Sequence, residues 1–387
     1  MNSRRDFIRN CAGLALATIF PATPVLAKTS LRVIKQLDYA YLLDVSPDSH
    51  KLCVYSTKNP YDLFRSADGR LSQLGRSGAD KADALKVIEL GSWKELISAS
   101  LIQRAAYASF FGDSGAIYIQ SGAPSRVTQR LFVDLRNGEK LEQVVPWSLH
   151  LNTSHFALMD RKLLGTVNNA ELGQTDTLVI VALPDYKEIQ RVPFAQLHSE
   201  ILKRTGGMSE SDIVLSDDRK AFAYAVEDRL VCRDAADIVN VWSQKVGPNL
   251  ILSLTAISAD AGVLAVCAGM GLESPDRNPR IEVFMRDAGT SKQFPIAQLV
   301  NAIAVSPDNK LLALAQNLPK PGSKDITQAT IILMDIETQK ELTRVIHDDV
   351  RAHQNPDHSI RANGLRFTAD GKYLVSSGLH TKIWEIS

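Results

Sequence analysis

The sequence predicts an all-β chain made of one repeated unit. Three observations lead to this prediction. Mainly apolar segments in which residue polarity alternates recur along the chain, and short turns containing aspartate join them in pairs. A further apolar segment follows most of these pairs. The chain has 387 residues, of which 45% are hydrophobic and 22% charged. This composition is ordinary for a soluble globular protein with a sizeable core.

The first copy of the repeat joins an apolar strand at 42–45 to a second strand at 52–55 through the turn Ser46-Pro47-Asp48-Ser49. Such turns place Pro or a small residue first and Asp, Asn or Gly where the backbone is most constrained. The last copy has its turn at Thr368-Ala369-Asp370-Gly371. Five more turns make seven in all: 112–115, 159–161, 216–218, 258–260 and 306–309.

Each copy continues into a third strand that often ends in an acidic residue, as at 131–134, 331–335 and 382–385. A fourth strand follows most copies, for example at 190–192 and 342–346. Seven units of four strands predict a single β-propeller with seven four-stranded blades over residues 28–387.

The turns and third strands resemble WD40-type (WD40/YVTN-like) propeller repeats. The resemblance covers nearly all of residues 28–387, and it is strongest at 301–387, where Ser306-Pro307-Asp308 precedes an apolar strand and Ile383-Trp384-Glu385 forms the last one. The Trp-Asp pair of that family is replaced by Trp384-Glu385, and its Gly-His pair has only His347 as a counterpart. The resemblance implies a rigid disc that binds proteins through its loops.

The two ends of the propeller region complement each other. The last copy stops after its third strand, whereas Leu31–Gln36 is a strand without a blade of its own. We therefore expect Leu31–Gln36 to pair with Lys382–Ile386 as the outer strand of the last blade, which closes the ring and removes an exposed sheet edge.

The first residues read as an export signal. Ser3-Arg4-Arg5-Asp6-Phe7-Ile8-Arg9 resembles the twin-arginine motif, and a short apolar run from Cys11 to Phe20 and the small-residue end Val25-Leu26-Ala27 follow it. The apolar run is too short to span a membrane. Residues 1–27 are thus expected to be a cleaved signal, and the mature protein to be periplasmic without a stable membrane anchor. Their removal changes the net charge from +1 to −1, so no electrostatic case exists for nucleic acid.

In a propeller, the second-to-third strand loops and the crossings between blades share one face. The segments that we expect to be long loops all fall there: 58–84, 121–129, 167–176, 269–280, 316–328 and 347–361. Long loops on a rigid scaffold commonly carry binding sites, so this long-loop face is the candidate site. The alternative is that these insertions arose by neutral drift and have no function, because loops accept insertions at little cost in stability.

The richest stretch on that face is residues 347–358. It contains six residues with binding potential: His347, Asp348, Asp349, His353, Asp357 and His358. Its histidines, His347, His353 and His358, could ligate a divalent metal, but their spacing matches no established metal motif. The other interpretation is a solvated polar loop. We expect partner or ligand contacts here, beside the 58–84 insertion.

Three cysteines follow the signal: Cys53, Cys232 and Cys267. Each lies in an apolar strand pattern, which favours a buried thiol. A disulfide between Cys232 and Cys267 is the alternative in an oxidising compartment.

Two classes of function remain. The sequence lacks a phosphate loop, a nucleophile elbow, paired-cysteine metal spacing and a haem attachment motif. This favours a scaffold that binds a periplasmic protein or a small ligand, with no cofactor assigned. The alternative is a periplasmic enzyme or enzyme subunit, by architectural analogy with the heavy subunits of quinoprotein amine dehydrogenases or with lactonases.

Overall fold

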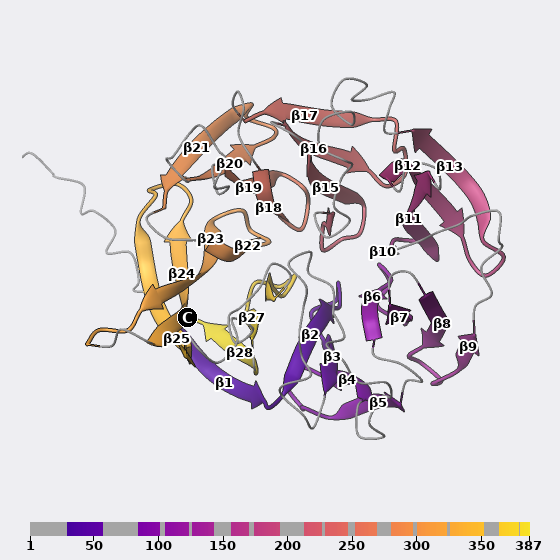
Figure 1. Ribbon diagram of the computed structural model, residues 1–387, viewed down its shortest axis with the longest axis horizontal. Coiled ribbons are helices and arrows are strands. Elements are labelled where there is room, and N and C mark those ends of the chain that lie inside the picture. The colour runs from indigo at the N-terminus through magenta and orange to yellow at the C-terminus, as the bar shows by residue number, and fades with distance from the viewer. Residues whose placement is uncertain are drawn as a thin grey trace, which may run out of the picture.

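The computed structural model describes residues 29–56, 84–100, 105–123, 126–142, 156–169, 174–193, 213–226, 229–246, 252–268, 280–296, 300–322, 326–351, 364–378 and 380–387. They form seven four-stranded antiparallel sheets around one axis (Figure 1), which confirms the seven-bladed β-propeller. The blades are, in chain order: blade 1, β2 (Ala40–Val45), β3 (Lys51–Ser56), β4 (Ala84–Glu89) and β5 (Glu95–Ser100); blade 2, β6 (Ala105–Phe110), β7 (Ala116–Ala123), β8 (Arg126–Asp134) and β9 (Lys140–Glu142); blade 3, β10 (Phe156–Ala157), β11 (Lys162–Asn169), β12 (Gln174–Ala182) and β13 (Lys187–Pro193); blade 4, β14 (Val214–Leu215), β15 (Ala221–Val226), β16 (Arg229–Asp234) and β17 (Val241–Lys245); blade 5, β18 (Leu252–Ile257), β19 (Val263–Ala268), β20 (Arg280–Met285) and β21 (Thr290–Pro295); blade 6, β22 (Val300–Val305), β23 (Leu311–Pro319), β24 (Ile326–Asp335) and β25 (Glu341–Arg351); blade 7, β26 (Leu365–Phe367), β27 (Tyr373–Ser377), β28 (Thr381–Ile386) and β1 (Leu31–Leu37).

The N-terminal strand closes the ring as predicted. β1 pairs antiparallel with β28, with Leu31 opposite Ile386 and Leu37 opposite Thr381, so it is the outer strand of blade 7 (Figure 1). Beyond the strands, the backbone N–H of Ser30 donates to the carbonyl of Ser387 at 2.7 Å, and that of Ser387 donates back at 3.2 Å. The pairing of β1 with β28 thus extends by one residue, which satisfies these backbone groups of Ser30 and Ser387.

The core consists of layers between neighbouring blades. Because each blade packs against a neighbour on both faces, its middle strands are apolar on both faces, and all six residues of β19 are buried. One apolar cluster fills each of the seven contacts between blades, including the contact between blades 7 and 1, where Val375 and Ile383 pack against Leu42 and Val54.

The short turns between the first and second strands occupy the face opposite the long loops. In the first turn, Ser46 Oγ accepts a bond from the Lys51 amide at 2.8 Å and donates to Asp48 at 2.6 Å. The residue after the aspartate adopts positive φ in all seven blades: Ser49, Ser114, Arg161, Arg219, Ala261, Asn309 and Gly371. Neighbouring turns are also linked, because the amide of Asp48 donates to Ser114 Oγ at 3.0 Å and that of Asp370 to Ser49 Oγ at 2.7 Å. On this short-turn face, hydrogen bonds therefore link the turn of blade 1 to the turns of both neighbouring blades.

Several segments expected to be long loops are instead extensions of hairpins. Strands cover most of 121–129, 167–176 and 316–328, and β25 continues through residues 347–351. Many residues of these segments are polar, so the apolar pattern that identifies a strand in the sequence is missing from them. The expected loops at 58–84 and 269–280 lie almost entirely outside the described residues.

Each of the three cysteines is a buried free thiol. Cys232 belongs to the cluster between blades 4 and 5, whereas Cys267 points into the cluster between blades 5 and 6. The alternative of a Cys232–Cys267 disulfide is therefore wrong, since the two thiols lie in different layers.

Candidate functional site

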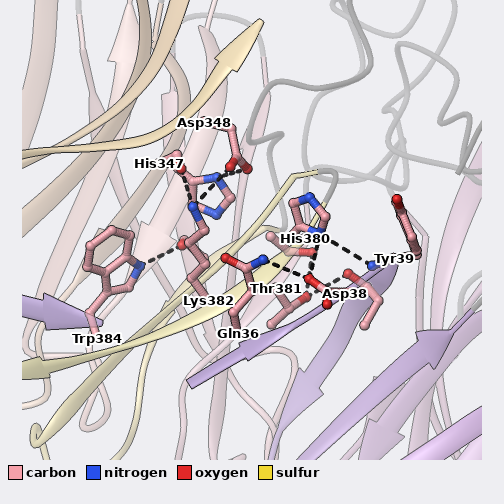
Figure 2. A network of polar contacts seen from close by, with 12 residues as sticks. Gln36, Asp38, Tyr39, His347, Asp348, His380, Thr381, Lys382 and Trp384 are labelled. Atoms are coloured by element: carbon pink, nitrogen blue, oxygen red, sulfur yellow. Dashed lines mark hydrogen bonds and ion pairs between the residues drawn. The ribbon is translucent and has the colours of Figure 1, made fainter. Parts of the chain in front are cut away.

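His347 lies in strand β25, and not in the solvated loop that is one of the two expectations from the sequence. Its side chain is fully buried, and its Nδ1 atom lies 2.6 Å from Oδ2 of Asp348 (Figure 2). The ring packs beside Trp384 of β28, with 6.3 Å between ring centroids. Trp384 in turn donates its indole N–H to Ser376 Oγ at 2.7 Å. His347 thus joins blade 6 to blade 7.

Asp348 and Lys382 form the charged part of this junction. Lys382 Nζ lies 2.9 Å from Oδ1 of Asp348 and also donates to the carbonyl of His347. Burial opposes the charge on Asp348, but hydrogen bonding to His347 and the positive charge of Lys382 hold the pKa of this carboxyl below its ordinary value. Both side chains are therefore fixed in place.

A more exposed group lies beside this junction, where β1 crosses into β2 and β27 turns into β28. His380 Nδ1 lies 3.2 Å from Oδ1 of Asp38, and the His380 and Tyr39 rings are 5.4 Å apart (Figure 2). Gln36 donates to Asp38 at 2.7 Å. Asp38 and Tyr39 are exposed, and Tyr39 has a φ of 49°, which is uncommon for a residue other than glycine. We call the six residues His347, Asp348, Lys382, His380, Asp38 and Tyr39 the rim cluster.

The rim cluster lies on the long-loop face. Asp38 and Tyr39 are in a crossing between blades, His380 is in a second-to-third strand turn, and β25 ends at that face. Sequence reasoning identified His347 and Asp348 but missed the other four residues. The signal was present, because pairing Leu31–Gln36 with Lys382–Ile386 already places residue 38 beside residue 380.

The remaining predicted site residues are not brought together in the described structure. Asp349 lies opposite Gln328 in the ladder between β24 and β25. His353, Asp357 and His358, like the export residues Arg4 and Arg5, lie outside the described residues. Within those that are described, no group of three or more His, Cys, Asp or Glu residues could hold a metal ion. No helix there is long and apolar enough to cross a membrane.

A second site, which sequence reasoning missed, lies inside the ring. The inner strands of blades 4 to 7 line a cavity of about 40 Å³ near the short-turn face. Its polar side chains are those of Asp217, Thr255 and Arg366. Burial raises the pKa of Asp217 to about 6, even though the charges of Arg219 and Arg366 act to lower it.

Comparisons with known proteins identify the fold. No family model matches the chain, and no curated protein matches it. The chain is similar to many solved structures, among them the following three. The first, described as "KlHsv2 with loop 6CD replaced by a Gly-Ser linker", has a TM-score of 0.54 and 11% identity, and the match covers 90% of this chain and 97% of that one.

The second, a chain from the "Crystal Structure of Mitotic Checkpoint Complex", has a TM-score of 0.53 and 12% identity over 92% and 94% of the two chains. The third is the Cps50 (Swd1) β-propeller domain from Myceliophteria thermophila, with a TM-score of 0.52 and 11% identity over 93% and 100%. At these identities the likeness concerns the fold alone, and it extends along nearly the whole length of this chain.

Proposed function

We propose that this protein is an exported periplasmic scaffold that binds another protein through the long-loop face, with the rim cluster at the centre of the contact. The observation that carries the proposal is the rim cluster itself. Exposed Tyr39 and Asp38 and the partly exposed His380 lie beside a base made of buried His347 and the partly buried Asp348 and Lys382.

This arrangement suits protein docking. Aromatic and charged side chains supply much of the binding energy of interfaces when they are held rigidly. Here the closed ring fixes the backbone, and the ion pairs of Asp348 fix the base. One of the similar structures comes from a multiprotein complex, by its own description. A seven-bladed disc can support binding without any chemistry.

Export through the twin-arginine route is consistent with the same architecture. That route carries folded proteins, and this ring is complete only when its first and last strands are paired. The periplasmic location rests on residues 3–9 and 25–27 of the sequence.

Site-specific photo-crosslinking in the producing cells tests the proposal. A photoreactive residue at Tyr39 is expected to give a crosslinked adduct of discrete mass. The same residue at Lys310, which is exposed on the short-turn face, is the matched control and is expected to give none. Asp38→Ala combined with His380→Ala should remove the adduct while the melting temperature stays unchanged. Equal adducts from both positions, or none from Tyr39, would contradict the proposal.

A further inference from the structure

The cavity inside the ring carries charges that the repeat does not require. In the five other blades with a turn of the same length, the position of Asp217 holds Pro47, Gly112, Ala259, Pro307 or Ala369. Arg366 stands two positions before its turn, where blades 4, 5 and 6 have Val214, Ala256 and Ala304, blade 2 has Ser109, and blade 1 has the acidic Asp44. Blade geometry therefore explains neither charge.

We propose that this cavity is a binding site for a small zwitterion of amino-acid type, whose ammonium group pairs with Asp217 and whose carboxylate pairs with Arg366. The site lies away from the long-loop face, so the inference does not depend on the proposed docking function.

The two charges line one cavity without contacting each other. Both residues belong to the described part of the chain, where neither side chain forms a hydrogen bond or ion pair, yet the charge of Arg366 still acts on Asp217. Two opposite charges that face a common space but are too far apart to pair match a ligand that carries one charge of each sign. Such a ligand would supply a charged partner to each of these two partly exposed groups.

A buried polar atom without a partner lies at the wall of this cavity. Thr255 is 8% exposed and lines the cavity, and its Oγ1 atom is buried without a hydrogen-bond partner in the described structure. Buried hydroxyl groups are rarely left unsatisfied, so a bound molecule is a natural partner for Thr255.

The size of the cavity limits the ligand. One water molecule needs about 10–15 Å³ of such a cavity. A cavity of about 40 Å³ therefore holds roughly three waters or one very small organic molecule. Apolar residues such as Ile303, Val305 and Phe367 form the rest of the lining and favour a compact ligand without a long polar side chain.

Calorimetric titration of the purified mature protein at pH 7.5 tests this inference. The probes are glycine, β-alanine and γ-aminobutyrate, which place the two charges at increasing separation, with acetate and methylammonium as single-charge controls. We expect one zwitterion to bind, with at least about tenfold higher affinity than either control, because it alone pairs both charged groups. Asp217→Asn and Arg366→Gln should each weaken its binding about tenfold or more, and Thr255→Val by a smaller factor.

A matched variant and a pH series separate specific binding from general effects. Asp308→Asn, on the surface of the blade 6 turn, should leave the affinity unchanged. Affinity should fall below pH 6, because protonated Asp217 no longer attracts an ammonium group; the other charges acting on Asp217 are those of Arg219, Arg366, Asp44 and Asp218. Near-ultraviolet circular dichroism verifies that each variant is folded. The inference is overturned if no zwitterion binds at 10 mM, or if a folded Asp217→Asn protein binds as the wild type does.

Discussion

Arg219 reaches Asp44 across the centre of the ring. Nη2 of Arg219, in blade 4, lies 2.7 Å from Oδ2 of Asp44, in blade 1, and both side chains are almost fully buried. Blades 1 and 4 are not neighbours, so this contact spans the axis. The same carboxylate oxygen accepts the backbone N–H of Phe110 in blade 2 at 2.8 Å, so that one buried group connects three blades.

Replacing one partner of this pair should be costly. Arg219→Met leaves the buried carboxylate without its counter-charge, and we expect the free energy of unfolding to fall by about 3 kcal/mol. Asp44→Asn leaves Arg219 without its counter-charge and should have a comparable effect. In the double variant the loss should be clearly smaller than the sum of the two single losses.

Equilibrium unfolding in urea measures these changes. Lys310→Met serves as the control, because the ion pair of Lys310 with Asp308 is exposed on the short-turn face. This substitution should change the free energy of unfolding by less than about 0.5 kcal/mol. Strictly additive losses in the Asp44/Arg219 cycle would show that the two residues do not act on each other.

Cross-linking the two ends of the ring should stabilise the whole propeller. Ser30 and Ser387 lie side by side, with their hydroxyl oxygens 2.7 Å apart. A disulfide formed by Ser30→Cys with Ser387→Cys closes a loop containing almost the entire chain, and we expect the free energy of unfolding to rise by about 3 kcal/mol in the oxidised form. The natural cysteines should not interfere, because burial raises the pKa of Cys53 and Cys232 and keeps these thiols inert.

The reduced form of the same variant is the internal control, and its stability should equal that of the wild type. Deleting residues 28–36 should have the opposite effect, because it exposes the edge of β28 and opens the ring; light scattering should then report aggregation. A variant that forms the disulfide without any gain in stability would argue against cooperative closure.

The repeat and the ring closure could be predicted because their signals are local or lie at the chain ends. Turns such as Ser46–Asp48 have fixed chemistry within a few residues, and the pairing of Leu31 with Ile386 follows from one missing strand and one surplus strand. The sequence therefore determined the number of blades and the outer strand of blade 7.

The site could be predicted only in part, because its contacts are non-local. The polar run at His347–Asp349 was expected to be a loop, whereas β25 extends through it and buries His347 against Trp384. The contact of Asp44 with Arg219 joins residues that are 175 positions apart in the sequence. Arg219 is a long charged residue at a turn position where most other blades have a small or uncharged residue. Neither contact has a signal in local periodicity.

Export should require the arginine pair at the N-terminus. Because the twin-arginine motif is recognised by a receptor that distinguishes arginine from lysine, replacing both Arg4 and Arg5 with lysine should leave the precursor in the cytoplasm. Cell fractionation and immunoblotting measure the distribution of the protein. Lys28→Arg, outside the motif, should be exported normally, and normal export of the double variant would rule out this route.

Asp217 should give the protein an unusual dependence of stability on pH. Burial raises the pKa of Asp217 from 3.8 to about 6 in the folded state, so between about pH 4 and pH 6 the native protein holds a proton that the unfolded chain releases. Stability from this group is therefore greatest at low pH and is lost as pH rises toward 6, by about 3 kcal/mol in total. Asp217→Asn cannot titrate, so it should be more stable than the wild type at pH 7, and the difference between the two proteins should shrink toward pH 4.

Urea unfolding at pH 4.5, 5.5, 6.5 and 7.5 measures that difference, with Asp308→Asn as the control that should follow the wild type. Carboxyls whose pKa is lowered, such as Asp348, lose their contribution only below about pH 4, outside this window. Parallel pH profiles for the wild type and Asp217→Asn would mean that Asp217 is ionised in the folded protein throughout this range.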